Sequence, residues 1–84
     1  MEFPKHFRKM LEERSIHDEW VERTIQDPDK VNSPGGGTNH YIKQIPENGG
    51  RWLRIIVNVD VVPNKAVTAF FDRRLRRMTD EDQS

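Results

Sequence analysis

The clearest strand pattern in the chain is RWLRIIVNV, residues 51–59. Side chains of a β-strand point alternately to its two faces, so every second residue shares a surface. One face of this segment is entirely apolar and the other is mixed, the first carrying Leu53, Ile55, Val57 and Val59 and the second Trp52, Arg54, Ile56 and Asn58. The alternation predicts a strand with one face in the core and one face of mixed chemistry.

Two further strands are predicted next to this one. Residues 38–45 precede it through a hairpin loop at 46–50, which we expect to be built on an Asn48-Gly49 turn. Residues 65–71 follow it after a turn at 60–64 that contains a proline. Alternation along this last strand places Val67, Ala69 and Phe71 on one face and Ala66, Thr68 and Phe70 on the other.

A fourth strand is weakly indicated before the hairpin. Val31 is suited to the start of a short edge strand, but residues 33–37 read Ser-Pro-Gly-Gly-Gly. Proline cannot donate to a sheet ladder, and glycine weakens a strand. We therefore expect residues 33–37 to break this strand and form a mobile loop.

Two helices are predicted at the N-terminus. Residues 4–14 begin with a proline suited to a first turn, and four apolar residues recur at helical spacing, namely Phe3, Phe7, Met10 and Leu11. A second helix is expected from Asp18 to Gln26, ended by Pro28, with an inner face of Trp20, Val21, Thr24 and Ile25.

The start of the second helix leaves two candidates for its N-cap, Ser15 and His17. With His17 as the cap, Ile16 and Val21 occupy the two positions of a hydrophobic staple. With Ser15 as the cap, Asp18 completes a capping box.

Helices followed by strands indicate an α+β fold. We expect two N-terminal helices packed on one face of a three- to four-stranded antiparallel sheet, with the second face open. Residues 1–78 would form one domain, because a chain of 84 residues has room for a single small core. Residues 72–78 read as a basic, helical extension, and the acidic residues 79–84 are predicted to be a disordered tail.

The composition excludes several classes of protein. There is no cysteine, so neither disulfides nor cysteine-ligated metals can supplement the core. No apolar stretch approaches the roughly 20 residues that span a bilayer, and residues 1–4 lack the features of a signal peptide. We expect a cytoplasmic protein with no membrane partner.

The net charge of zero hides an uneven distribution of charged residues. Residues 1–34 hold six Lys/Arg and eight Asp/Glu, residues 35–78 hold eight and three, and residues 79–84 hold none and three. The three segments therefore carry −2, +5 and −3. A locally basic segment attracts phosphate even in a neutral protein, although it is also typical of a solvated, ion-paired surface.

Three kinds of chemistry are disfavoured. The three histidines lie far apart and show no metal-ligand spacing, so no metal or other cofactor is expected. The glycines at 35–37 lack the Lys-Ser/Thr ending and the preceding strand of a phosphate-binding P-loop. No nucleophile elbow accompanies the two serines that precede the central strand.

Metal-free cleavage of RNA has a simpler requirement, and the chain has candidates for each part of it. The reaction needs a base for the 2′-hydroxyl proton, a cation for the phosphorane and an acid for the leaving oxygen. His6, at the edge of the apolar stripe of the first helix, is the first acid/base candidate and His40 the second; a partly buried structural histidine is the plain alternative for His6.

Binding groups for RNA surround the central hairpin and the last strand. The cations suited to phosphate contacts are Lys43, Arg51, Arg54, Arg73 and Arg74. The aromatic residues suited to stacking on unpaired bases are Tyr41, Trp52 and Phe70, although we expect at least one of them to lie in the core.

Five segments in order resemble a group of small bacterial domains of unknown function. The matching segments are residues 10–21, 27–29, 40–43, 52–57 and 67–71. Those domains have a helix-borne histidine, an "RGIS" helix turn and a late "TAY" or "TVY" strand. They are in turn distantly similar to toxins of the RelE, ParE and BrnT type and to the wider barnase-EndoU-colicin-RelE group of metal-free ribonucleases.

The resemblance implies two helices on a curved sheet, with RNA held on the sheet. Carried over by position, His6 matches the helix-one histidine, Arg54 a cation of the sheet and Thr68 the threonine of the late strand. Phe70 stands where several relatives have tyrosine, and the chain is not basic overall as many ribosome-dependent toxins are. ParE-like members act on gyrase instead of RNA, so the fold alone does not choose the target.

The function predicted from the sequence is a toxin-type, metal-independent endoribonuclease acting on single-stranded RNA. In it, His6 is the general acid or base, Arg54 and Arg51 are the phosphate cations, and Thr68 positions the substrate. Tyr41 or Trp52 stacks on a base. The alternative is a non-catalytic module that docks a protein or nucleic acid on its open face. A toxin also implies a cognate antitoxin as its partner, covering Trp52, Arg54 and the basic segment 73–77.

Overall fold

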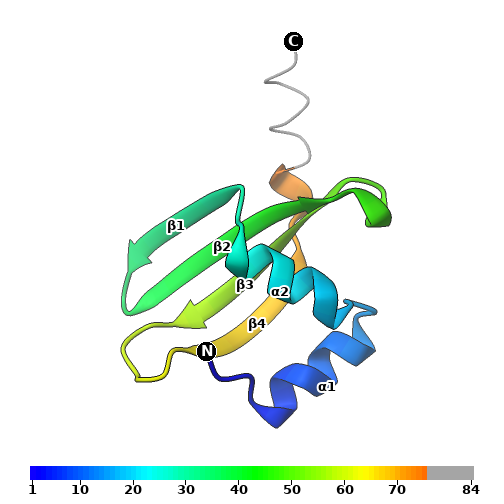
Figure 1. The fold of residues 1–84 in the computed structure, drawn as a ribbon. Coiled ribbons are helices and arrows are strands. Elements are labelled where there is room, and N and C mark those ends of the chain that lie inside the picture. Colours follow the sequence, from blue (N-terminus) through cyan, green and yellow to red (C-terminus); the bar gives the residue numbers. More distant parts are fainter. Residues whose placement is uncertain (76–84) are drawn as a thin grey trace.

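A computed structural model of the protein, in which residues 1–75 are described, contains a four-stranded antiparallel sheet (Figure 1). The strands are β1 (Lys30–Gly35), β2 (Thr38–Ile45), β3 (Arg51–Asn58) and β4 (Lys65–Phe71), and they lie in chain order across the sheet. The predictions for β2 and β4 are confirmed, and β3 ends one residue before its predicted end. Adjacent strands are joined by short loops, as expected for an antiparallel meander.

The expectation of a loop over residues 33–37 is wrong. β1 continues through Gly35, which pairs with Thr38 after a register shift that begins at Asn32. Pro34 is tolerated there because β1 is an edge strand and its pairing is irregular at this point. No ladder hydrogen bond is therefore needed from the N–H that proline lacks. Only Gly36 and Gly37 remain as the turn, at φ of 68° and 77°.

Both predicted helices are present and lie on the same face of the sheet, α1 (Lys5–Glu13) and α2 (Asp18–Gln26). His17 is the N-cap of α2, with an extended backbone and no side-chain capping hydrogen bond. Ile16 and Val21 are buried at the two staple positions. Of the two caps that the sequence left open, the structure therefore uses His17, whose ring also stacks on Trp20.

The core lies between the helices and one face of the sheet. Its centre on β3 is the predicted apolar set of Leu53, Ile55 and Val57, each with no exposed surface, and Val59 packs against them. Phe7 and Leu11 of α1 and Trp20 and Val21 of α2 cover these residues. The predicted dry face of β3 is confirmed.

The predicted alternation of β4 is interrupted by a bulge. The register shifts between Ile56 and Val57, so that Ala66 pairs with Val57 and is buried, whereas Val67 is 42% exposed. A bulge adds one residue to a strand and so moves the following side chains to the other face. The inner residues of β4 are Ala66, Ala69 and Phe71, and the prediction for Val67 is wrong.

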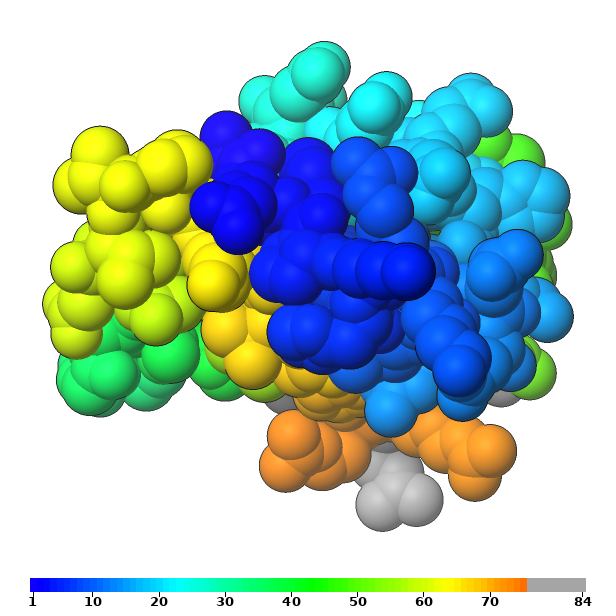
Figure 2. All heavy atoms as spheres, turned by 90° about the horizontal axis from the view of Figure 1, so that it is seen from below, coloured from blue at the N-terminus to red at the C-terminus, as the bar shows by residue number. Residues whose placement is uncertain are grey.

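The two edges of the sheet differ. Figure 2 shows the N-terminal segment and α1 lying against β4. The amide of Ala66 donates to the carbonyl of Glu2, and the guanidinium of Arg14 donates to the carbonyl of Ala69 at 2.7 Å. The β1 edge has all six residues exposed. Its proline, lysine and bulge are features that discourage pairing with another strand.

The loop between β2 and β3 is a 3-10 turn, η1 (Pro46–Asn48), rather than the predicted Asn-Gly turn. Gly49 and Gly50 take the positive φ values. After β4, residues 73–75 form a helical turn. The rest of the predicted extension, 76–78, and the predicted acidic tail, 79–84, lie outside the described residues. The α+β fold, with both helices on one face of an antiparallel sheet, is confirmed.

Candidate functional site

The face of the sheet opposite the helices, here called the helix-free face, collects the polar side chains of β2, β3 and β4. Residues paired across an antiparallel ladder point to the same face. Arg54 pairs with Ile42 on one side and Phe70 on the other, and Ile56 pairs with His40 and Thr68. By this register and the alternation of each strand, the face carries Lys30, Asn32, His40, Ile42, Gln44, Trp52, Arg54, Ile56, Asn58, Thr68 and Phe70.

Arg54 is the centre of a buried charged cluster on this face. Its Nε donates to Oδ2 of Asp72 at 3.0 Å, and its Nη1 lies 2.7 Å from Nδ1 of His40. Arg54 and Asp72 are 9% and 5% exposed. Buried charges in proteins are stable only when they are paired and hydrogen-bonded. The pairing therefore holds the guanidinium in one position beside the imidazole.

Asp72 is held from a second side by Arg74. The backbone N–H of Arg74 donates to Oδ1 of Asp72 at 3.0 Å, and the Arg74 guanidinium lies 3.4 Å from the same oxygen. Burial alone raises the pKa of Asp72. The hydrogen bonds from Arg74 and the charges of Arg54 and Arg74 outweigh that effect and lower the pKa of Asp72 below its ordinary value of 3.8.

His40 is neutral where it meets Arg54. Burial, and then the positive charge of Arg54, lower the pKa of His40 below its ordinary value of 6.5. A guanidinium only donates hydrogen bonds, so Nδ1 of His40 is the acceptor of the 2.7 Å bond and the ring proton lies on Nε2. The site therefore holds a neutral imidazole against a permanent cation.

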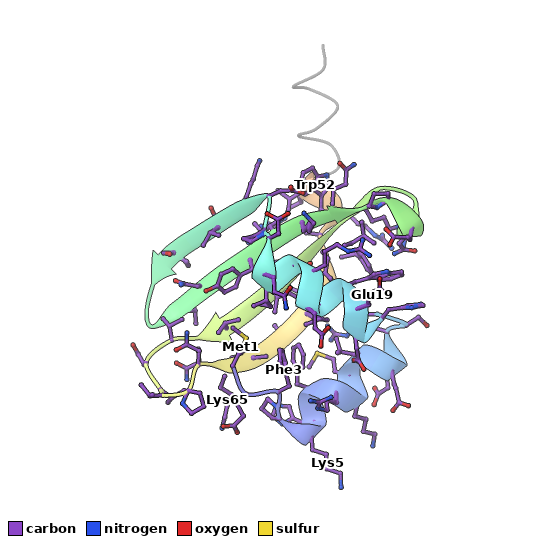
Figure 3. All side chains as sticks on the ribbon, viewed as in Figure 1. Met1, Phe3, Lys5, Glu19, Trp52 and Lys65 are labelled. Atoms are coloured by element: carbon purple, nitrogen blue, oxygen red, sulfur yellow. The ribbon has the colours of Figure 1, made fainter. Side chains whose placement is uncertain are left out.

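Apolar and aromatic groups surround this cluster. Ile42, which pairs with Arg54, is buried although it does not belong to the core beneath the helices. The ammonium of Lys30 lies 6.0 Å from the ring centre of Trp52, over its face. Trp52 stands at the end of the sheet where residues 72–75 leave β4 (Figure 3).

Three of the predicted site residues are not brought to Arg54. His6 is exposed on α1, on the other side of the sheet. Tyr41 pairs with Ile55 and packs against the core beneath the helices, so its ring is not free to stack on a base. Lys43 donates to the carbonyl of Asp27 at 2.8 Å and lies 3.6 Å from the carboxylates of Asp27 and Asp29.

Thr68 shares the helix-free face by its register, but its hydroxyl is directed elsewhere. Its Oγ1 lies 3.2 Å from Sδ of Met10 on α1, to which it donates. β4 is an edge strand with α1 beside it, so a side chain near the edge can reach the helix. In this structure Thr68 links β4 to α1 instead of joining the Arg54 cluster.

The remaining predicted cations lie around the end of the sheet. Arg51, Trp52 and Arg73 line a hollow, together with Phe71 and Asp72. Arg74, with its side chain 85% exposed, lies next to this hollow through its ion pair with Asp72. The structure therefore brings together five of the predicted residues around one end of the sheet, namely Arg51, Trp52, Arg54, Arg73 and Arg74.

Asp72 is the residue of the candidate site that the sequence analysis did not single out. The sequence places it in a basic stretch, where it reads as part of a charged extension. One available signal was its position directly after a strand whose neighbour carries an arginine among apolar residues. An arginine in the middle of an apolar strand requires a counter-charge, and Asp72 is the first carboxylate that follows β4.

Within residues 1–75, no group of three or more His, Asp or Glu side chains is arranged to hold a metal ion. In the same residues, no helix is long and apolar enough to cross a membrane.

The fold and the site define a small α+β domain with a helix-covered apolar face and a second face on which a half-buried histidine contacts a buried arginine–aspartate pair. The chain belongs to the domain-of-unknown-function family DUF4258, whose sequence profile matches residues 3–71. The match spans both helices and all four strands, contains His40 and Arg54, and ends one residue before Asp72. No curated protein and no solved structure matches the chain. The predicted resemblance to domains of unknown function is confirmed, and the more distant similarity to toxins stays a prediction.

Proposed function

We propose that this domain is a toxin-type endoribonuclease of the RelE/BrnT kind, which cleaves single-stranded RNA without a metal ion on its helix-free face. The observation that carries the proposal is the 2.7 Å contact between a neutral His40 and the buried guanidinium of Arg54. Cleavage of RNA through its 2′-hydroxyl needs a base and a cation within reach of one phosphate. His40 and Arg54 supply this pair.

The proposed reaction begins when a phosphate takes up the Nη1 hydrogen bond of Arg54 and so releases Nδ1 of His40. The 2′-hydroxyl gives its proton to Nδ1 as its oxygen bonds to phosphorus. The bond from phosphorus to the 5′-oxygen then breaks, and that oxygen takes a proton from water, while the resulting hydroxide receives the proton that His40 gained. The products are a 2′,3′-cyclic phosphate and a 5′-hydroxyl end. Arg54 neutralises charge on the phosphorane, while Asp72 holds the guanidinium in place.

The substrate is held by the cations and the aromatic ring around this pair. Lys30, Arg51 and Arg73 make no ion pair within residues 1–75, so their charge is available to phosphates. Asp72 is the carboxylate closest to the pair, and Arg54 and Arg74 already neutralise it. Trp52 offers an aromatic surface for an unpaired base.

The proposal assigns the base to His40, the second histidine candidate of the sequence, and not to His6. An exposed residue on α1 cannot share a phosphate with Arg54 across the sheet. Thr68, which the sequence suggested as a positioning hydroxyl, supports the fold through Met10 in this proposal.

Incubation of the purified protein with single-stranded RNA in EDTA tests the proposal. His40→Gln keeps a hydrogen-bond acceptor for Arg54 but provides no base, so we expect cleavage to fall by about 100-fold or more. The matched control is His6→Gln, which removes an exposed histidine from the other side of the sheet and should leave cleavage unchanged. Arg54→Lys keeps the charge and loses the planar fork, so it should also be severely impaired. Circular dichroism confirms that each variant is folded.

Equal losses in the His6 and His40 variants would contradict this assignment. Cleavage that EDTA abolishes would contradict the metal-free reaction. RNA left intact by the wild-type protein under all conditions, with ribosomes present or absent, would contradict the nuclease.

A second candidate function is binding without cleavage, to a protein or a nucleic acid. It is favoured by the Arg54–Asp72 pair, which occupies Nε of the guanidinium before any ligand arrives. Binding to RNA through phosphates weakens steeply with salt, whereas docking of a protein on apolar and aromatic groups does not. The salt dependence of RNA binding by the His40→Gln variant therefore separates the two kinds of partner.

The toxin proposal also requires a cognate antitoxin. We expect an acidic or amphipathic segment of that partner to cover Trp52 and Arg54, because these residues combine an aromatic surface with a cation. Co-expression with the product of the neighbouring gene, followed by purification, tests for the complex. A complex that survives the Trp52→Ala and Arg54→Lys substitutions would contradict this location.

A further inference from the structure

The hollow at the end of the sheet gathers hydrogen-bond donors that have no acceptor. Among the arginine side chains of residues 1–75, those at 8, 14, 23, 54 and 74 each contact a carbonyl, a carboxylate, an imidazole or an aromatic ring. Arg51 and Arg73 make none of these contacts. Both line the same hollow.

The topology explains why these two arginines come together. Leu53 pairs with Phe71, and the amide of Asp72 donates to the carbonyl of Trp52 at 2.8 Å. The start of β3 and the end of β4 therefore lie side by side, and Arg51 and Arg73 flank that junction. Two positive charges that line one hollow repel each other, so an anion bound in the hollow is stabilised by both.

A third unpaired donor belongs to Trp52, another of the residues that line the hollow. Nε1 of Trp52 is buried and has no hydrogen-bond partner in the described part of the chain. Such orphaned donors are rare in native structures and call for an explanation, of which a ligand is one. Trp52 lines the hollow with Arg51 and Arg73.

The carboxylate that lines the hollow does not compete with a bound anion for the unpaired donors. Asp72 is its acidic residue, and both carboxylate oxygens are engaged by Arg54 and Arg74. The volume of the hollow is about 410 Å³, which falls in the range of small-ligand pockets. Trp52 and Phe71 provide apolar wall next to the cations.

We infer that this hollow binds the phosphomonoester of a nucleotide, such as a terminal phosphate of RNA. Two unpaired guanidinium groups match the charge of a phosphomonoester, about −1.5 to −2 at neutral pH, better than the single charge of an internal phosphodiester. The inference rests on the proposed function for the identity of the substrate as RNA. It adds that one end of that substrate is anchored beyond Asp72, next to the reacting phosphate at Arg54.

The test is a titration of the ¹⁵N-labelled full chain, followed through its two indole N–H resonances. The Trp52→Phe variant assigns the resonance of Trp52 and so separates it from that of Trp20. We expect AMP to move the Trp52 resonance and adenosine, which lacks the phosphate, to leave it in place. Inorganic phosphate should move it at higher concentration than AMP, because it lacks the base and the sugar.

The double substitution Arg51→Gln/Arg73→Gln should weaken AMP binding by about tenfold or more, since it removes charged hydrogen-bond donors. Its matched control is Lys5→Gln/Lys9→Gln, which removes two exposed charges from α1 and should leave AMP binding unchanged. Equal losses in both double variants, or equal binding of adenosine and AMP, would overturn the site. If inorganic phosphate binds as tightly as AMP, the hollow is a site for free phosphate and the assignment to a nucleotide is wrong.

AMP has no internucleotide bond, so its binding does not depend on cleavage. AMP bound at Trp52 together with uncleaved RNA would support this site and contradict the nuclease. RNA cleaved without any response to AMP would support the nuclease and overturn this site.

Discussion

Ile55 and Ile56 are neighbours on β3, yet they lie in two different environments. Ile55 faces the helices and has no exposed surface, whereas Ile56 lies on the helix-free face between His40 and Thr68 and is partly exposed. The helix-covered face is closed by apolar packing. The helix-free face is held by a buried ion pair and a neutral histidine. One strand therefore supplies both the core and the candidate site.

Truncation of the two isoleucines gives the largest expected contrast between the faces. Ile55→Ala leaves a cavity in a closed core and should lower the free energy of unfolding by about 2–5 kcal/mol. Ile56→Ala, at a partly exposed position, should lower it by about 1 kcal/mol. Urea denaturation followed by circular dichroism measures both. Equal losses would show that the helix-free face is packed as tightly as the core.

The ion pair on the helix-free face is tested by Asp72→Asn. This change leaves the Arg54 guanidinium buried without its counter-charge, and we expect a loss of about 3 kcal/mol in the free energy of unfolding. Replacing both partners, as in Arg54→Met/Asp72→Leu, removes the unpaired charge and should restore stability to within about 1 kcal/mol of the wild type.

The double variant sharpens the comparison of the faces, because it should be folded but unable to cleave RNA. If the double variant is as unstable as Asp72→Asn, the ion pair itself stabilises this face. The loss in Asp72→Asn would then not be due to the unpaired charge of Arg54.

A smaller effect is expected from pH. The folded pKa of His40 lies below its unfolded value of 6.5, so the unfolded chain binds the extra proton first as the pH falls. The contribution of His40 to stability is therefore complete above pH 6.5 and is lost as the pH falls from 6.5 through the folded pKa. Urea midpoints measured across this window test the prediction.

His40→Gln should remove that part of the pH dependence, and His6→Gln should retain it. A folded pKa of His40 above 6.5, measured by NMR, would contradict the neutral imidazole on which the proposed reaction depends.

The smallest effect is expected at Arg74. It pairs with the same carboxylate as Arg54, but its side chain is 85% exposed. Ion pairs in contact with solvent contribute little, so Arg74→Gln should lower the free energy of unfolding by less than about 1 kcal/mol, with an effect that fades in high salt. A loss equal to that of Asp72→Asn would contradict the distinction between the buried and exposed partners of Asp72.

Local patterns predicted the helix-covered face well. The spacing of Phe7 and Leu11 and the alternation of Leu53, Ile55 and Val57 each reflect the geometry of one element, so they can be recognised without its neighbours. The same alternation assigned Trp52 and Arg54 to the other face, as the structure has them. Two local patterns narrowed the N-cap of α2 to two residues, a hydrophobic staple for His17 and a capping box for Ser15.

Predictions failed where a neighbouring strand decides the outcome. The bulge that exposes Val67 exists because β4 pairs with β3 out of strict register. β1 extends through Pro34 and Gly35 because β2 offers it a partner. Tyr41 and Lys43 were expected to meet RNA, but their strand parity places them on the helix face. A shift of one residue in register reverses the face of every side chain in a strand, and local composition does not encode it.

The candidate site shows the same division between local and distant information. The amino-acid sequence alone determined two amphipathic helices, strands at 38–45 and 65–71, a central strand predicted as 51–59, and an Arg54 that faces away from the core. The meeting of Arg54 with His40, 14 residues earlier, and with Asp72, 18 residues later, depends on the registers of three strands and the turn after Phe71. Those registers are set by packing of the whole sheet against its helices, because only the complete core distinguishes one alignment of the strands from the next.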